Sequence, residues 1–555
     1  MTSSPGAGAD AELKDAGQAA PFAPAPEERT TARFSRVYGG IVLAVFVTFL
    51  VSSAVRRPVP SVNEPHYLGK ARHYWQPDWC AGDLFLESSN PHRVFYQTVG
   101  VITRWMTLPQ SAWTGRLLAL ACLAWGWTRL LSRLLPGRWQ PLGAAWVFLL
   151  LQSLGNFSGE WLVGGVEAKV FAYAFVFAGL ASGLERRWVP AGIWIGLAIS
   201  FHVIIGLWAV VAALLGTAGF LYGQSRTFDR SDKPRNTHRQ CSFDRNAATL
   251  GGAALLLCAL PGLLPALGLL RGGDPALAAQ ADRLQVGTRL SHHLDPMQFP
   301  LSDYRYYALL LVLAAILWRT TPSSTARRWF AWFVGATLMI AATGVLIGWG
   351  PRPLSGMPFS ILRVWWLKFY PFRLADLFVP ILVSVTVMAA CHATLLRSTL
   401  SMWQRRAIQI LAAVAFLASL VLPTPDRNPS RMTAAKQADW LDVCRWIREQ
   451  TPADALLYAA NEDWAVKWFA ERPEFVNYKD CPQDTEGIIE WARRLRLVNG
   501  WAGEAFTDGR CSADELAQLH TDTGITHLTA SRLGPIDLEP AYRNGHFRVY
   551  AIGPD

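Results

Sequence analysis

Residues 38–55 read YGGIVLAVFVTFLVSSAV, and residues 62–92 follow them as VNEPHYLGKARHYWQPDWCAGDLFLESSNPH. The first stretch is almost wholly apolar and long enough to cross the hydrocarbon core of a bilayer as a helix. The second stretch is polar and aromatic, and it contains several carboxylates. Together they predict a membrane-spanning helix followed by a loop, just beyond the membrane surface, that carries the chemistry of the protein.

The composition of the whole chain agrees with a membrane protein. Of its 555 residues 51% are hydrophobic and only 17% are charged, whereas ordinary soluble domains carry about 25% charged residues. The net charge is +11, and the basic residues lie in short clusters between apolar runs. Basic residues that orient helices in a membrane are placed in this way. Because no compact basic domain or base-stacking motif is present, the expected partner is the lipid bilayer and not nucleic acid.

The eight cysteines include no CxxC pair, so zinc and haem sites are not expected. Cys444, Cys481 and Cys511 share the polar C-terminal stretch. Two of them could form one disulfide if that stretch faces an oxidising compartment. Three cysteines do not define which two would pair.

Hydropathy predicts about eleven transmembrane helices, so the expected fold class is an α-helical polytopic membrane protein. The pair of segments between 189 and 222 reads either as one tilted helix or as a tight hairpin around Ser200-Phe201-His202. The predicted spans are 37–54, 112–132, 141–157, 167–184, 189–202, 204–222, 247–270, 304–320, 329–349, 372–396 and 405–423.

Five basic clusters decide between these alternatives, because cytoplasmic loops are enriched in Lys and Arg. All five face one side only if 189–222 crosses twice, which favours the hairpin and a cytoplasmic N-terminus. Loops 55–111, 158–166, 271–303 and 350–371 then share the outer face of a bacterial cytoplasmic membrane. The clusters are Arg129, Arg133 and Arg138; Arg186 and Arg187; the loop 223–246; Arg319, Arg327 and Arg328; and Arg397, Arg405 and Arg406.

Three regions are expected along the chain. Residues 1–35 are rich in Ala, Pro and Gly and lack periodicity, which predicts a disordered cytoplasmic tail. Residues 36–423 hold the spans, and 424–555 alternate helix and strand, which predicts a small extracytoplasmic α/β domain. Its helices are expected at 439–450, 463–472 and 485–498, and its strands at 455–460, 474–479, 525–531 and 547–552.

The first outer loop supplies the candidate catalytic residues, Glu64 and Asp83. A carboxylate there can deprotonate an acceptor hydroxyl or hold a divalent cation against a phosphate. His66 and Tyr67 are candidate substrate-binding residues, because aromatic side chains beside acids are a common way to bind sugars. The alternatives are two solvated loop acids and an aromatic belt at the membrane interface.

Two further groups of candidate substrate-binding residues lie in later segments. Glu167 and Lys169 open the fourth span, where ionisable side chains are costly and therefore functional or paired; the alternative is a structural salt bridge to another span. Arg289, His292 and His293 lie in the third outer loop, where contact with phosphate or substrate is favoured over a zinc site. The alternative is an exposed loop with no role.

Lys368, Arg373 and Asp376 lie at the start of the tenth span, in LKFYPFRLADLFVP. The planar guanidinium of Arg373 suits a phosphate, with Asp376 as its orienting partner. The alternative is an Arg–Asp pair that only anchors the span. His202, in the predicted hairpin, is expected to be a buried, hydrogen-bonded histidine.

The order of these segments resembles the GT-C class of membrane glycosyltransferases, which includes mannosyl-, arabinosyl- and oligosaccharyl-transferases that use polyprenyl-phosphate sugars. The resemblance covers most of 37–550. It implies transfer of a sugar, with inversion, from a polyprenyl-phosphate carrier to a glycan, lipid or protein acceptor, with Glu64 as general base and Arg373 as phosphate clamp. Asn63-Glu64 and Gly82-Asp83 depart from the Asp-x-Asp or Glu-x-Asp pattern of the class, so dependence on Mg²⁺ or Mn²⁺ is left open.

Two other functions are compatible with the same sequence. A transporter or flippase for lipid-linked saccharides would place charges near the bilayer midplane and show internal repeats. Here the charged candidates gather at one face, and no repeat is evident. A non-catalytic membrane scaffold, whose C-terminal domain binds a partner, is the third hypothesis.

Overall fold

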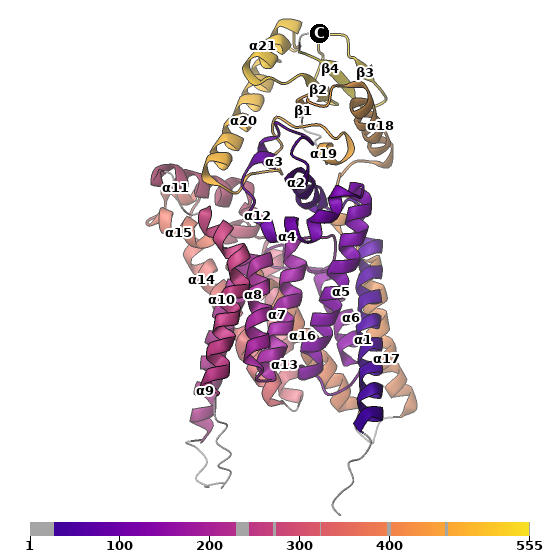
Figure 1. The fold of residues 1–555 in the computed structure, drawn as a ribbon, viewed down its shortest axis with the longest axis vertical. Coiled ribbons are helices and arrows are strands. Elements are labelled where there is room, and N and C mark those ends of the chain that lie inside the picture. Colours follow the sequence, from indigo (N-terminus) through magenta and orange to yellow (C-terminus); the bar gives the residue numbers. More distant parts are fainter. Residues whose placement is uncertain are drawn as a thin grey trace, which may run out of the picture.

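The structure is a computed structural model that describes residues 27–228, 244–269, 274–321, 323–396, 401–460 and 464–553. Each of the eleven predicted spans forms a helix, and together they pack side by side as a bundle (Figure 1). The helices are α1 (Glu27–Arg56), α5 (Leu108–Leu134), α6 (Gln140–Leu154), α7 (Ala168–Leu184), α8 (Trp188–Phe201), α9 (Val203–Phe228), α10 (Arg245–Gly268), α13 (Leu301–Thr320), α14 (Thr325–Gly348), α16 (Arg373–Leu395) and α17 (Met402–Val421).

Within the described residues, eight of these helices are long and apolar enough to cross a membrane. The other three, α6, α7 and α8, are shorter apolar helices. All but three residues of α7 are buried, so its neighbours in the bundle cover it on every side. The predicted fold class, a polytopic α-helical membrane protein with a small C-terminal α/β part, is confirmed.

The hairpin between 189 and 222 is present. Helix α8 ends at Phe201, α9 begins at Val203, and His202 between them has extended backbone angles of φ −153° and ψ 96°. The helical conformation is therefore interrupted at a single residue, and the His202 side chain points into the protein at this interruption.

The four loops expected on one face lie at the same end of the bundle as the C-terminal strands (Figure 1). They are mostly helical: the first contains α2 (Glu64–Trp75), α3 (Leu84–Glu87), α4 (Arg93–Gln97) and η1 (Val99–Arg104), the third α11 (Pro275–Leu284), η2 (Gln285–Arg289), α12 (Ser291–Leu294) and η3 (Pro296–Gln298), and the fourth η4 (Leu354–Gly356) and α15 (Ser360–Leu367). The assignment of this end to the outside of a cell stays a prediction.

Some predictions lie outside the described residues. These are most of the disordered tail (1–26), the middle of the basic loop 223–246 (229–243), and Arg397. Helix α1 begins at Glu27, before the first predicted span.

The C-terminal region, residues 424–553, forms a four-stranded sheet with helices around it. The order is β1-β2-β4-β3, with β1 parallel to β2 and the other pairs antiparallel. The elements are η5 (Pro425–Arg427), α18 (Ala434–Gln450), β1 (Leu457–Ala459), α19 (Val466–Phe469), α20 (Thr485–Glu504), α21 (Ala513–Thr523), β2 (His527–Ala530), β3 (Tyr542–Arg543) and β4 (Arg548–Ala551). Cys444, Cys481 and Cys511 are free thiols.

The prediction of a strand at 474–479 was wrong. Only Glu474 forms a bridge, to Leu457 of β1. The Asn477 side chain then accepts hydrogen bonds from the backbone N–H groups of Lys479 and Asp480. Such a local bond offers the backbone an alternative to the sheet and turns the chain. The turn brings Lys479 and Asp480 toward the first loop.

Candidate functional site

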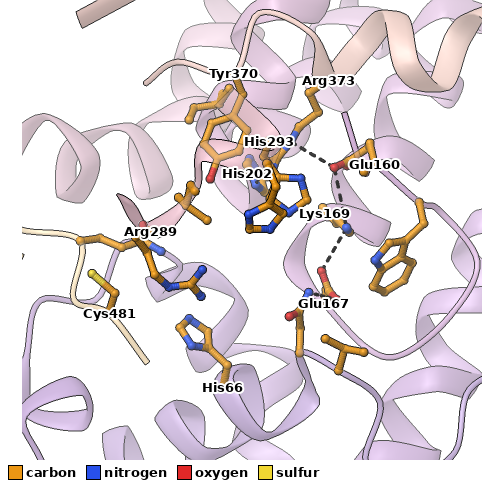
Figure 2. A pocket seen from close by; sticks show the side chains of 18 of the residues that line it. His66, Glu160, Glu167, Lys169, His202, Arg289, His293, Tyr370, Arg373 and Cys481 are labelled. Carbon is orange, nitrogen blue, oxygen red and sulfur yellow. Dashed lines mark hydrogen bonds and ion pairs between the residues drawn. The ribbon is translucent and has the colours of Figure 1, made fainter. Parts of the chain in front are cut away.

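A large cavity of about 1410 Å³ lies where the helix bundle meets the C-terminal region. Its wall contains nine of the side chains predicted for a site, and Figure 2 shows how several of them point toward a common space. These nine are His66, Tyr67, Glu167, Lys169, Arg289, His292, His293, Lys368 and Arg373. Glu64, Asp83 and Asp376 do not line it.

Four charged residues form a chain of ion pairs at the centre of the cavity, here called the central charge cluster. Arg373 lies 3.2 Å from Glu160, and Lys169 lies 3.8 Å from Glu160 and 3.4 Å from Glu167 (Figure 2). The Asn63 amide donates to Glu167 at 2.9 Å. All four members are largely buried, and buried charges persist only when they are paired in this way.

The positions of these groups follow from how the chain enters α7 and α16. Glu167 is the residue that precedes α7, and Lys169 lies in its first turn. Arg373 begins α16 and packs over the ring of Tyr370 at 4.1 Å. Ionisable side chains at the ends of apolar helices lie near the surface of the membrane. The starts of α7 and α16 are at the same end of the bundle, so side chains from both helices meet in one cluster.

Glu64 is placed elsewhere, which corrects its expected role as general base. Its carboxylate is fully buried and forms a bidentate pair with Arg116, with both contacts at 2.7 Å. It also accepts from the backbone N–H groups of Ser61 and Val166. No oxygen is left to meet a substrate hydroxyl, because both already accept two hydrogen bonds.

Asp376 is likewise a structural carboxylate and not the partner of Arg373. It accepts from the backbone N–H groups of Phe157, Ser158 and Glu160 at 2.6, 2.9 and 2.8 Å. Glu64 holds Val166 and Asp376 holds Glu160, so the two acids fix opposite ends of residues 156–167, here called the 156–167 loop. This loop carries Glu160 and Glu167 into the cavity.

Gly165 allows that loop to approach Glu64. A Cβ atom at this position would lie 2.9 Å from Glu64 Oε1 and 2.8 Å from Ser61 Cβ. Any larger residue would therefore push the loop away from the carboxylate that anchors it.

Asp83 joins the first loop to the C-terminal region and is also not at the cavity. It accepts from the backbone N–H of Leu86, which caps α3, and from that of Glu474. Lys467 lies 3.1 Å from Asp83, 2.6 Å from Glu474 and 2.8 Å from Asp480. Three carboxylates around one buried lysine make this contact an interdomain anchor.

His66 connects that anchor to the cavity. Its Nδ1 lies 3.1 Å from Asp480, and its ring packs 4.1 Å from that of Phe85. Burial lowers the pKa of His66, although its hydrogen bond to Asp480 opposes this. Tyr67, the next residue, contacts His92 through its hydroxyl at 3.4 Å.

The third loop contributes Arg289, His292 and His293 to the wall of the cavity. Arg289 donates to the carbonyl of Lys479 at 2.7 Å, and its Nε is buried without a hydrogen-bond partner among the described residues. The rings of His292 and His293 lie 4.1 Å apart, and His293 Nδ1 lies 2.5 Å from the carbonyl oxygen of Ser158. Burial lowers the pKa of His293 to about 3.

Lys368 is paired at the edge of the cavity. Its ammonium group donates to both oxygens of Asp282, at 2.9 and 2.7 Å. This ion pair connects the end of α15 to α11.

Two important residues were not predicted to act here. Glu160 lies in the short loop before α7, and the only signal for it was that this loop shares a face with the other candidates. His202 was expected to be merely buried, but it lines the cavity, and its Nε2 lies 2.9 Å from an Arg373 nitrogen (Figure 2). The signal for His202 was its place at a break between two helices.

The residues present do not fit a divalent cation. Mg²⁺ and Mn²⁺ prefer several carboxylate and carbonyl oxygens. Among the described residues no group of three or more His, Cys, Asp or Glu side chains is placed to hold a metal. Glu160 and Glu167 instead have Lys169 between them, so a cationic side chain takes the position that a metal would need.

One segment of the chain matches a family model. Residues 438–498 fit a domain of unknown function (DUF6798). This segment contains Lys467, Glu474 and Asp480 of the interdomain anchor. No curated protein matches the chain.

The chain is similar to several solved structures, including the following three. The arabinofuranosyltransferase AftD from Mycobacteria has 14% identity and a TM-score of 0.48, covering 93% of this chain but only 41% of its own. The oligosaccharyltransferase AglB from Archaeoglobus fulgidus, in complex with an inhibitory peptide and a dolichol-phosphate, has 11% identity and a TM-score of 0.39 and covers 89% and 69%. A complex of the Archaeoglobus fulgidus oligosaccharyltransferase with Zn and sulfate has 12% identity and a TM-score of 0.38 and covers 88% and 68%.

The chain thus spans less than half of the arabinofuranosyltransferase. What it does has to follow from the residues of its own cavity.

Proposed function

We propose that this protein is a membrane glycosyltransferase that moves a sugar from a lipid-phosphate carrier to an acceptor hydroxyl. One observation carries the proposal: a single cavity joins two buried carboxylates and a set of cations to an apolar flank formed by α9 and α10. Such a cavity suits a substrate with an acyl or prenyl chain, an anionic linkage and a sugar.

The charge of the cavity favours an anionic substrate. Its described lining contains eight Lys and Arg residues against four Asp and Glu residues, an excess of four positive charges. The basic residues are Arg56, Arg57, Lys169, Arg289, Lys368, Arg373, Arg431 and Lys479, and the acidic residues are Glu160, Glu167, Asp282 and Asp426.

Arg373 and Arg289 are the proposed ligands of the carrier phosphate. The Arg373 guanidinium is held by Glu160, His202 and the Tyr370 ring, so little ordering is needed when it meets a phosphate. Within the described part of the chain, Arg289 Nε has no hydrogen-bond partner and is available to donate to the phosphate. The carrier chain would lie along the apolar flank, where Leu207 and Leu263 line the cavity.

Glu167 is the proposed general base. Glu160 contacts Arg373 and so lies beside the leaving phosphate, whereas Glu167 lies at the other end of the cluster, beyond Lys169. Inverting transfer requires this separation, because the acceptor attacks the anomeric carbon from the face opposite the leaving group.

The step balances without a cofactor. The acceptor oxygen forms a bond to the anomeric carbon while the bond from that carbon to the phosphate oxygen breaks. The electron pair goes to the phosphate, whose charge the arginines neutralise, and the hydroxyl proton goes to Glu167. Lys169 holds both carboxylates apart throughout.

We place this reaction on the outer face of a bacterial cytoplasmic membrane. The support is the positive-inside rule, since the basic clusters at the end of α5 and at the starts of α8 and α14 lie at the end of the bundle opposite the cavity (Figure 1). The acceptor would be a component of the cell envelope, either a glycan, a lipid or a protein.

The test is transfer by the purified full-length protein in lipid nanodiscs, supplied with a panel of polyprenyl-phosphate sugars and membrane extract as acceptor. Glu167→Gln is expected to lose at least about 100-fold in turnover, the usual contribution of a general base, while retaining donor binding. Glu504→Gln, on the exposed surface of α20, serves as the matched control. Full turnover by Glu167→Gln would remove the base assignment. Movement of the carrier across the bilayer with no sugar transfer would establish a transporter instead.

A further inference from the structure

The cavity extends beyond the central charge cluster into a second arm. Its lining residues come from α1, from α6 and from the segment that follows α17. These three helices lie on the side of the bundle away from α9 and α10 (Figure 1). Its lining includes Ser52, Arg56, Arg57, Ser153, Pro423 and Arg431. The proposed donor site does not use these residues.

The second arm is basic. Arg56, Arg57 and Arg431 line it against one carboxylate, Asp426, which pairs with Arg57. Arg57 is buried, and that burial together with the neighbouring Arg56 lowers the pKa of its guanidinium to about 10. Positive charge at a partly desolvated site, in excess of what the protein neutralises, favours an anionic ligand.

The arm begins directly beside the proposed base. The Trp161 ring has the Lys169 ammonium 4.0 Å from its centroid and the Arg57 guanidinium 4.8 Å from it. Trp161 therefore lies between the central charge cluster and the arm. A ligand with its anionic group at Arg57 has the rest of its head group within reach of Glu167.

The outer end of the arm, lined by Pro423 and Thr424, lies just beyond the C-terminal end of α17. Helix α17 exposes Val414, Leu417 and Val421, at 48%, 59% and 74% of their surface. Its C-terminal end is tied to α1 by Arg56, which donates to the carbonyls of Ser419 and Leu422. The Arg56 hydrogen bonds can open without loss of apolar packing, and the exposed apolar face of α17 is suited to contact with lipid chains.

We propose that the second arm binds the acceptor, and that the acceptor is a lipid with a phosphate in its head group. The phosphate lies on Arg57 and Arg431, the hydroxyl points to Glu167, and the chain leaves between α1 and α17. The acceptor role rests on the proposed function, whereas the anionic-lipid site does not. Both substrates then enter from the bilayer, through opposite flanks of one bundle.

Photo-crosslinking tests this site. The full-length protein in phosphatidylcholine nanodiscs is exposed to phosphatidic acid with a diazirine in its acyl chain, and the adducts are mapped by mass spectrometry. Adducts are expected at 149–153 and 414–424. Arg57→Gln and Arg431→Gln should each reduce them about tenfold, the effect of one charge-assisted hydrogen bond. Arg445→Gln, exposed on α18, is the control and should leave them unchanged.

Two further measurements separate the outcomes. Photoreactive phosphatidylcholine should give no enrichment at 149–153, and millimolar inorganic phosphate should not displace the phosphatidic acid; full displacement would show a site for soluble phosphate. Absence of adducts at 149–153 and 414–424, with adducts still present at 207–211 and 263–267, overturns the second arm and leaves the donor site intact. Adducts at all four of these segments without any sugar transfer would support the lipid site and reject the proposed glycosyltransferase activity.

Discussion

Glu64 and Arg116 form a bidentate ion pair with both contacts at 2.7 Å, and neither side chain is exposed to solvent. The pair also fixes the chain around it, because Arg116 donates to the carbonyls of Arg57 and Pro58. One buried pair therefore connects the end of α1, the start of α2, helix α5 and the 156–167 loop.

Glu64→Gln is expected to destabilise the protein by about 3–5 kcal/mol, because it leaves the Arg116 charge buried without a counter-charge. The measurement is the thermal unfolding midpoint in detergent. In a double-mutant cycle, Glu64→Gln with Arg116→Gln should cost less than the sum of the two single variants. Additive losses would show that the two side chains do not act as a pair.

Lys467→Met is expected to loosen the C-terminal region from the first loop. The substitution leaves Asp83, Glu474 and Asp480 without their shared cation, and a broken buried pair costs about 3–5 kcal/mol. Limited proteolysis between 424 and 433 should become faster. Arg445→Met removes an exposed charge from α18 and provides the control. Equal cleavage rates for the two variants would contradict the anchor.

Gly192→Ala is expected to disrupt the packing of α8 on α10. An added Cβ atom would lie 1.9 Å from the carbonyl oxygen of Gly251, and backbone at this distance cannot move aside cheaply. Small residues allow such close crossings in membranes, and overpacking costs about 1–3 kcal/mol. Gly252→Ala, on the same helix as Gly251 but with no atom within 4 Å of its Cβ, should be neutral in the same melting experiment.

Acidification is expected to destabilise the fold through two buried histidines in the loops at the cavity end. Burial lowers the pKa of His92 and of His293 to about 3, so the folded protein keeps both neutral. The unfolded chain takes up these protons below a pH of about 6.5, so stability falls as the pH drops from 6.5 toward 3. At pH 5 the loss approaches about 2 kcal/mol for each histidine.

The check is the unfolding midpoint between pH 7.5 and pH 5 for the wild type and for His293→Asn. The asparagine amide can donate to the Ser158 carbonyl, which His293 contacts. The variant should show a shallower dependence on pH. An unchanged slope would mean that His293 is already protonated in the folded protein.

The helices of the bundle were predictable because their signal is local. An apolar run of sufficient length forms a span wherever it stands, and the break at His202 followed from the placement of basic clusters. The pairing of Lys169 and Arg373 had a related signal, because a charge at the end of an apolar helix is costly unless it has a partner or a function.

The role of Glu64 was not predictable from its surroundings in the sequence. Its partner Arg116 lies 52 residues later, on a face of α5 that only the packing of the bundle selects. The same holds for Asp83 and for His66, whose partner Asp480 is 414 residues away. In each case an acid or a histidine in the first loop is assigned its role by tertiary contacts, and Glu160 and Glu167 take the place in the cavity that was expected for Glu64.

The C-terminal region contributes Tyr478, Lys479 and Cys481 to the wall of the cavity. A ribosome finishes these residues only after every helix of the bundle has been made. Until they are made, the part of the cavity wall that the bundle provides lacks the side that these residues supply. Enclosure of the cavity therefore waits until residues 424–553 have been made and have packed on the first loop through the Lys467 contacts.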